Sequence, residues 1–184
     1  MRSAAARDTF FRVALSAVGM TFVLAVARMR RMSFRDDLGL QWPTLGKALL
    51  WLAPFLALVL LQEFFWKATG LPQPQKWGDK YNSFVKATRV LGMVVLAPVF
   101  EETLFRGLLY HTIANTSLKE VGAISITSVA FAVLHFQSGF RFMPFVLANG
   151  VFYGIVRYST GSTLMTILFH GLGNSYAAYQ RLSR

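Results

Sequence analysis

Ionisable side chains that could activate a water molecule lie inside three apolar runs of this sequence. Glu101 and Glu102 stand in the middle of one run, and His135 and His170 lie in two others. A charged side chain near the bilayer centre costs about 2.5–3.5 kcal/mol even on the most lenient scale, so such residues usually face a cavity or a partner. A carboxylate can take a proton from water while an imidazole orients that water or holds a metal ion. These residue types therefore predict hydrolysis by an activated water.

Helical spacing separates the two glutamates into different roles. Glu102 and Arg106 are four residues apart and share one helix face, where an ion pair would lower the cost of burying the carboxylate. Glu101 points about 100° away, so a buried ion pair that only locks helix packing does not explain it. We therefore expect Glu101 to have a chemical role. His170 and Asn174 also share a face, and Asn174 and an imidazole could donate hydrogen bonds to a developing oxyanion.

The candidate side chains come from three separate apolar segments, so we expect them to converge on one polar cavity. The set is Glu101, Glu102, Arg106, His135, His170 and Asn174. Each histidine taken singly could equally be an interhelical hydrogen-bond partner. Glu63 and His111 are expected at the membrane interface instead. The chain has no cysteine, which excludes thiol catalysis, and the scheme needs no serine, so an activated water is favoured over an acyl-enzyme.

Composition indicates that membrane helices position these residues. The 184 residues are 54% hydrophobic and 15% charged, whereas soluble domains average about 45–50% and about 25%. The net charge of +11 would suit nucleic acid, but a basic soluble protein does not need so much apolar length. We expect an all-α, polytopic integral membrane protein with its Lys and Arg residues, Arg157 among them, in loops and at interfaces, and with no nucleic-acid partner.

A membrane helix needs about 20 mostly apolar residues, and six segments approach that length. They are Phe10–Ala27, Leu45–Trp66, Ser83–His111, Val121–Phe136, Phe140–Tyr158 and Ser162–Tyr179. The first could be a signal peptide, but the arginines that follow it favour a retained anchor. The Pro- and Gly-containing stretch Lys67–Tyr81 predicts a loop or interfacial linker. We expect membrane helices and a basic linker over 1–85 and a catalytic core over 86–184, in one membrane domain.

Three motifs in this order resemble the CPBP intramembrane proteases, which include the type II CAAX prenyl endopeptidases and the bacteriocin-processing Abi proteins. The motifs are E-E-T-L-F-R at 101–106, F-A-V-L-H at 131–135 and H-G-L-G-N at 170–174. They match the patterns E-E-x-x-x-R, F-x-x-x-H and H-x-x-x-N, and the resemblance spans Val90–Tyr179. It implies a helical membrane core, similar to that of a CAAX protease, around a polar intramembrane cavity.

The resemblance also implies roles for the motif residues. Glu101 and His135 would activate water, His170 and Asn174 would stabilise the oxyanion, and Glu102 and Arg106 would support the site. The family has been described both as metalloendopeptidases and as metal-free glutamate proteases. No cofactor is certain, but Glu101, His135 and His170 could hold a divalent metal such as zinc.

The expected substrate is a membrane-anchored, lipidated or unlipidated, peptide or protein tail in a prokaryotic cytoplasmic membrane. Two other functions remain open from the sequence. One is a non-catalytic peptide-binding or bacteriocin-immunity protein that uses the same cavity. The other is a small proton-coupled transporter, although no internal repeat supports it.

Overall fold

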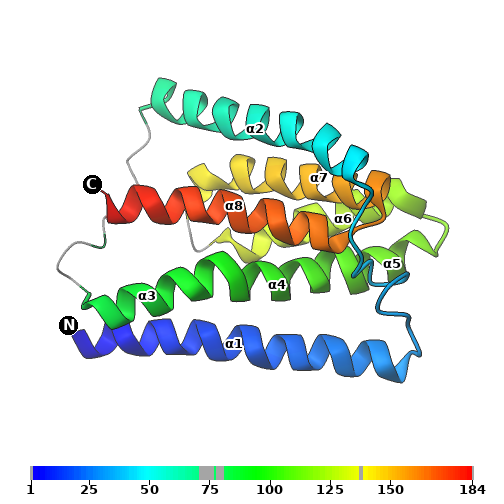
Figure 1. The fold of residues 1–184 in the computed structure, drawn as a ribbon, viewed down its shortest axis with the longest axis horizontal. Coiled ribbons are helices and arrows are strands. Elements are labelled where there is room, and N and C mark those ends of the chain that lie inside the picture. The colour runs from blue at the N-terminus through cyan, green and yellow to red at the C-terminus, as the bar shows by residue number, and fades with distance from the viewer. Residues whose placement is uncertain (1, 71–76, 78–80, 137–138, 184) are drawn as a thin grey trace.

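The computed structural model describes residues 2–70, 77, 81–136 and 139–183, and every regular element in these ranges is helical. The predicted all-α fold class is therefore confirmed. The elements are α1 (Arg2–Met29), α2 (Leu45–Ala68), α3 (Ser83–Leu91), η2 (Gly92–Leu96), α4 (Ala97–Glu102), η3 (Thr103–Leu109), α5 (Tyr110–Ala114), α6 (Lys119–Leu134), η5 (Phe140–Phe142), α7 (Met143–Thr160) and α8 (Thr163–Leu182). α3 to α5 form one continuous helix over Ser83–Ala114, and both termini lie at the same end of the bundle (Figure 1).

The predicted number of six membrane-spanning helices is not confirmed. Three helices of the described chain are long and apolar enough to cross a bilayer: Ala6–Met29, Leu45–Ala68 and Ser83–Ala114. α6 has 16 residues, short of the about 20 that a span needs. The three apolar helices nevertheless support an integral membrane protein.

Side-chain caps and a glycine fix the starts of the helices near the glutamates and histidines. The Asn82 side chain accepts a hydrogen bond from the Val85 amide at 2.8 Å, which caps α3. The Ser162 hydroxyl accepts one from the Met165 amide at 3.0 Å and caps α8. Gly161, between α7 and α8, has a φ of 69°, a left-handed conformation that glycine adopts at little cost. The chain therefore reverses sharply before the helix that carries His170.

The long helix widens into π geometry on both sides of the glutamates, at η2 and η3. In η2 the Ala97 amide donates to the Gly92 carbonyl, five residues back. The next carbonyl in this register, that of Met93, would need an amide from Pro98, which has none. The Asn174 side chain on α8 donates to the Met93 carbonyl instead, at 2.8 Å. The proline thus leaves an acceptor that ties α8 to the glutamate helix.

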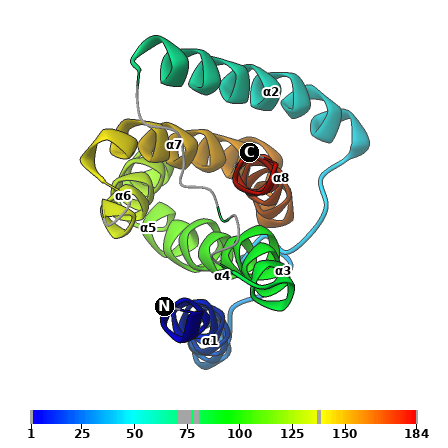
Figure 2. The ribbon, with the colours of Figure 1, turned by 90° about the vertical axis from the view of Figure 1, so that its left-hand side faces the viewer.

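α2 stands to one side of the bundle and packs mainly against α7 and α8, whereas α1 lies along the opposite side against the long helix (Figure 2). Phe55 of α2 stacks on Phe169 of α8 with ring centroids 4.6 Å apart. α2 continues to Ala68, which overlaps the start of the predicted linker Lys67–Tyr81. Residues 71–76 and 78–80 of that linker lie outside the described residues.

The segment between α1 and α2 is anchored to the α7–α8 turn rather than free. The Leu38 side chain is fully buried. Thr163 donates from its hydroxyl to the Leu38 carbonyl at 2.6 Å and from its amide to the Gly39 carbonyl at 2.7 Å. Arg157, expected in a loop, is also buried and donates to the carbonyls of Arg106 and Asp37. That expectation is wrong because these carbonyls give the guanidinium buried acceptors.

Candidate active site

Glu101 lies between the two predicted histidines. Its Oε2 atom is 3.9 Å from Nε2 of His135 and 3.9 Å from Nε2 of His170. The three residues come from α4, the C-terminal end of α6 and α8. Its side chain is 21% exposed, so it remains within reach of a small molecule. The structure thus brings together residues that lie up to 69 positions apart in the sequence, from Glu101 to His170.

Glu102 points away from that group and pairs with Arg106, as the spacing predicts. Arg106 donates from Nη1 to Oε1 of Glu102 at 3.3 Å, and both side chains are 0% exposed. Its Nη2 atom donates to the Gly150 carbonyl on α7 at 3.0 Å, and the guanidinium lies 4.7 Å from the centre of the Phe131 ring. The pair therefore connects the long helix to α6 and α7.

A backbone acceptor fixes the orientation of His135. Its Nδ1 atom lies 2.8 Å from the Phe131 carbonyl, and because a carbonyl only accepts, Nδ1 must carry the proton and donate. In the neutral ring Nε2 then has a lone pair. That lone pair and the Glu101 carboxylate face each other across 3.9 Å, a gap that suits a bridging donor such as water.

His170 is held from two sides. Its Nδ1 atom lies 3.0 Å from Oε1 of Glu102, and an ionised carboxylate accepts that hydrogen bond. The ring of Tyr153 stacks on it, with centroids 5.4 Å apart and an angle of 20° between the planes. Glu102 thus joins His170 to Arg106 in one buried network, while Nε2 of His170 faces Glu101.

Asn174 lies one helical turn beyond His170, and its side-chain amide donates to the Met93 carbonyl at 2.8 Å. One N–H of its amide remains for another acceptor, because the side chain has two. His111, expected at the interface, lies outside the cluster, with Nε2 3.6 Å from Oδ1 of Asp37.

A cavity of about 450 Å³ opens beside this cluster, between α2, α7 and α8. His135, His170 and Asn174 line it together with aromatic side chains, and Glu101 is not among its lining residues. The enclosed polar cavity predicted from the sequence is therefore not confirmed, because many of these walls are apolar.

Several residues outside the predicted site also line this cavity. Glu63, expected at the interface, binds Lys67 at 3.0 Å and accepts from Gln180 on α8 at 3.1 Å. Gln62 donates to Asn149 on α7 at 3.0 Å. The sequence does mark Gln62 and Glu63, because they form an adjacent polar pair in the otherwise apolar segment Leu45–Trp66. Tyr153 gave no such signal, since aromatic residues are common throughout this chain.

The metal ligands suggested by the sequence, Glu101, His135 and His170, are not supported. Within the described residues no three His, Cys, Asp or Glu side chains are arranged to hold a metal ion. A tetrahedral zinc with bonds of about 2.0–2.2 Å holds its ligand atoms about 3.4 Å apart. The carboxylate oxygen lies 3.9 Å from each nitrogen, so this arrangement is wider than a zinc site.

Comparison with protein families agrees with the motifs. Residues 83–176, slightly more than half of the chain, match the family model described as type II CAAX prenyl endopeptidase Rce1-like. The chain belongs to this family. Membership in the Rce1-like family implies a protease and, with the three apolar helices, an integral membrane protein. No curated protein and no solved structure matches the chain. The matched range contains all six candidate residues, Glu101 to Asn174.

Proposed function

We propose that this protein is a membrane-embedded endopeptidase that hydrolyses a peptide bond with a water activated by Glu101 and His135. The observation that carries the proposal is the position of Glu101 Oε2, 3.9 Å from Nε2 of both imidazoles. Two lone-pair atoms face each other across the Glu101–His135 gap, and a water within about 2.8 Å of each can lie off the line that joins them. That water donates one hydrogen to each acceptor, which leaves its own lone pair for attack.

In the reaction, the water oxygen bonds to the scissile carbonyl carbon while one of its protons passes to Glu101. The carbonyl oxygen becomes an oxyanion. When the tetrahedral intermediate collapses, the C–N bond breaks and Glu101 returns the proton to the leaving amine. The net change is addition of one water across the peptide bond, with the carboxylate restored.

Asn174 and His170 are the proposed donors to the oxyanion. Asn174 uses the amide hydrogen that the Met93 carbonyl does not occupy. Nδ1 of His170 already donates to Glu102, so the ring can donate from Nε2 only when it carries both protons. Glu102 and Arg106 act as positioning residues, because they hold His170 without facing the gap.

The proposed substrate is a membrane-anchored peptide or protein tail, which reaches the cluster through the cavity between α2, α7 and α8. A lipid attached to such a tail would lie among the apolar side chains that the helices expose. We place the protein in a prokaryotic cytoplasmic membrane.

The test compares protein termini in membranes from cells that express the wild type or Glu101→Gln at matched levels. Glu120→Gln is the matched control, because Glu120 is exposed at the start of α6. His135→Ala is compared in the same way with His111→Ala. We expect new termini with the wild type and both controls, and none with Glu101→Gln or His135→Ala.

New termini that persist in Glu101→Gln would contradict the mechanism. Identical termini in all samples, with Glu101→Gln still conferring the wild-type phenotype, would contradict proteolysis and favour binding without cleavage.

A further inference from the structure

The end of α1 carries four exposed arginines within eight residues, called here the arginine cluster. They are Arg28, Arg30, Arg31 and Arg35. α1 is one of the helices long and apolar enough to cross a bilayer, and its apolar stretch ends at Met29. A helix that spans the bilayer up to this residue brings the arginine cluster to the depth of the lipid headgroups. None of the four arginines lines the cavity beside the candidate active site.

The carboxylates nearest in sequence do not pair with the arginine cluster. Asp36 and Asp37 both accept hydrogen bonds from Ser33, at 3.2 and 2.8 Å. In the described part of the chain, no carboxylate oxygen lies within 4.0 Å of a nitrogen of these four arginines. Arg30 and Arg35 donate to neutral side chains instead. With four arginines against two aspartates, the segment 28–37 keeps a positive charge that no ion pair holds.

The backbone at Arg31 has a conformation that favours glycine. Its φ is 54°. Its amide donates to the Arg28 carbonyl at 3.0 Å, and the following amide, that of Met32, donates to the Ala27 carbonyl at 2.9 Å. These two bonds end α1 with a Schellman motif, whose left-handed position usually holds glycine. An arginine has a β-carbon that crowds the backbone there, so it occupies this position at a steric cost.

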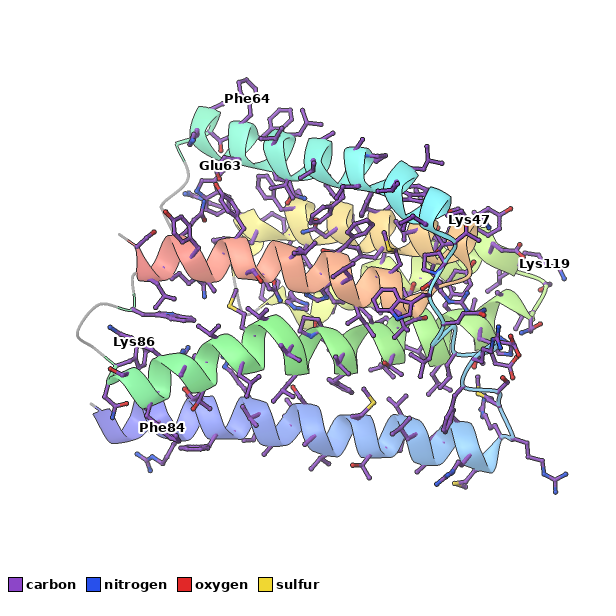
Figure 3. The ribbon with its side chains drawn as sticks, in the orientation of Figure 1. Lys47, Glu63, Phe64, Phe84, Lys86 and Lys119 are labelled. Atoms are coloured by element: carbon purple, nitrogen blue, oxygen red, sulfur yellow. The ribbon has the colours of Figure 1, made fainter. Side chains whose placement is uncertain are left out.

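The same strain recurs at a second basic residue. Lys119 has a φ of 52°, and within the described chain it and Arg31 are the two non-glycine residues with a positive φ. Figure 3 shows Lys119 at the end of the bundle where α1 finishes, opposite the N-terminus. Strained residues persist only where other interactions maintain them, and they gather at functional sites. Because glycine would end α1 with less strain, the guanidinium rather than the backbone explains the arginine.

Apolar side chains stand beside the arginines at the surface. Met29 and Phe34 are both exposed, and they alternate in sequence with Arg28, Arg30 and Arg35. A segment that combines exposed apolar and cationic side chains next to a membrane helix is typical of contact with an anionic membrane surface.

We propose that the arginine cluster binds the headgroups of anionic phospholipids. A guanidinium can donate two parallel hydrogen bonds to the oxygens of one phosphate, and it keeps its charge at any physiological pH. Because α1 ends at Arg31, the cluster combines arginines of the helix with Arg35 of the connection to α2. A zwitterionic lipid has the same phosphate but no net charge, so the cluster should discriminate between the two lipid classes.

Lipid titration of the purified full-length protein tests this proposal. Native mass spectrometry in a neutral detergent gives the dissociation constant of the first bound lipid, for phosphatidylglycerol and for phosphatidylcholine with the same acyl chains. We expect phosphatidylglycerol to bind about tenfold more tightly, and replacement of all four arginines with glutamine to reduce this ratio to about one. Lys86→Gln, at the opposite end of the bundle (Figure 3), is the charge-matched control and should leave the ratio unchanged.

Arg31→Gly separates lipid binding from the structural role of this residue. Glycine relieves the strain at φ 54°, so we expect the unfolding midpoint to rise by about 2–4 °C. The same variant should bind phosphatidylglycerol about fivefold more weakly, the effect of one basic residue near an anionic surface. A purely structural role for Arg31 does not predict weaker lipid binding by a more stable protein.

Equal dissociation constants for the two lipids, or a preference that survives replacement of the four arginines, would overturn the proposal. Unchanged affinity in Arg31→Gly, or an equal loss in Lys86→Gln, would also overturn it. Inorganic phosphate that displaces phosphatidylglycerol at an equal concentration would assign the cluster to a free anion and contradict the lipid assignment. Thermal unfolding shows that each variant is folded. Lipid binding does not require cleavage, so failure here is distinct from failure of the proposed proteolysis.

Discussion

The Glu102 carboxylate is completely buried and receives hydrogen bonds from Arg106 and His170. Removing Arg106 would leave a buried carboxylate without its positive partner, a change that typically costs about 3–5 kcal/mol. Glu101 is partly exposed, and its Oε2 atom lies 3.9 Å from Nε2 of His135 and of His170, which is longer than a hydrogen bond.

We therefore expect Arg106→Ala to lower the free energy of unfolding by about 3–5 kcal/mol, and Glu101→Gln to change it by less than about 1 kcal/mol. Thermal unfolding in detergent, together with the amount of protein recovered from membranes, measures both. Equal unfolding midpoints for the two variants would contradict the buried pairing of Glu102 with Arg106.

Tyr153 should matter through its ring rather than its hydroxyl. The ring stacks on His170, and aromatic pairs contribute about 0.5–1.5 kcal/mol. We expect Tyr153→Leu to lower the rate of proteolysis about three- to tenfold, with Tyr153→Phe close to the wild type. The yield of wild-type-specific termini over time gives the rates. A loss as large in the phenylalanine variant would assign the effect to the hydroxyl instead.

At the scale of the helices, Pro98 and Asn174 form a compensating pair. The proline withholds an amide from the Met93 carbonyl, and the asparagine supplies a donor from α8. Asn174→Ala leaves this carbonyl unpaired, which costs about 1–3 kcal/mol. Pro98→Ala restores a backbone donor in the same register.

We expect Asn174→Ala to destabilise the protein by about 1 kcal/mol less in the Pro98→Ala background than in the wild type. Unfolding free energies of the two single variants and the double variant measure this coupling. Proteolysis should stay low in the double variant, because the oxyanion donor is still missing. Strictly additive free energies would show that the carbonyl has another donor.

The sequence predicted contacts within one helix better than it predicted helix distortions or contacts between distant helices. Glu102 and Arg106 were predictable because a four-residue spacing brings side chains together on any helix. The widened segment η2 was not, because it depends on how Asn174 of α8 satisfies the backbone acceptor that Pro98 leaves unpaired. The contact between Glu63 and Gln180 was not predictable either, since the two residues are 117 positions apart and no local pattern reports such a contact.

At the scale of the whole molecule, α2 stands to one side of the bundle, away from the long helix that carries the glutamates (Figure 2). It packs mainly against α7 and α8, and the cavity lies between these helices. We therefore expect a substrate tail to enter between α2 and α7.

The absence of cysteine in the natural sequence makes this route testable by crosslinking. Gln62 and Asn149 are hydrogen-bonded across the α2–α7 boundary at 3.0 Å. Replacing both with cysteine and joining them with a short reducible crosslinker should abolish production of new termini, and reductant should restore it. Either single cysteine treated with the same reagent is the control. Full proteolysis in the crosslinked protein would exclude entry at this boundary.

The widened turns of the long helix also constrain how such a protein can change over evolutionary time. Glu101 and Glu102 sit between two π segments, Gly92–Leu96 and Thr103–Leu109. Gain or loss of one residue in either segment would rotate the part of the helix beyond it by about 100°. In Thr103–Leu109 this change would separate the glutamates from Arg106. In Gly92–Leu96 it would turn the glutamates and Arg106 together away from α8. Length variation among natural relatives should therefore be confined to the connections between helices, and the stretch from Gly92 to Leu109 should keep a constant number of residues.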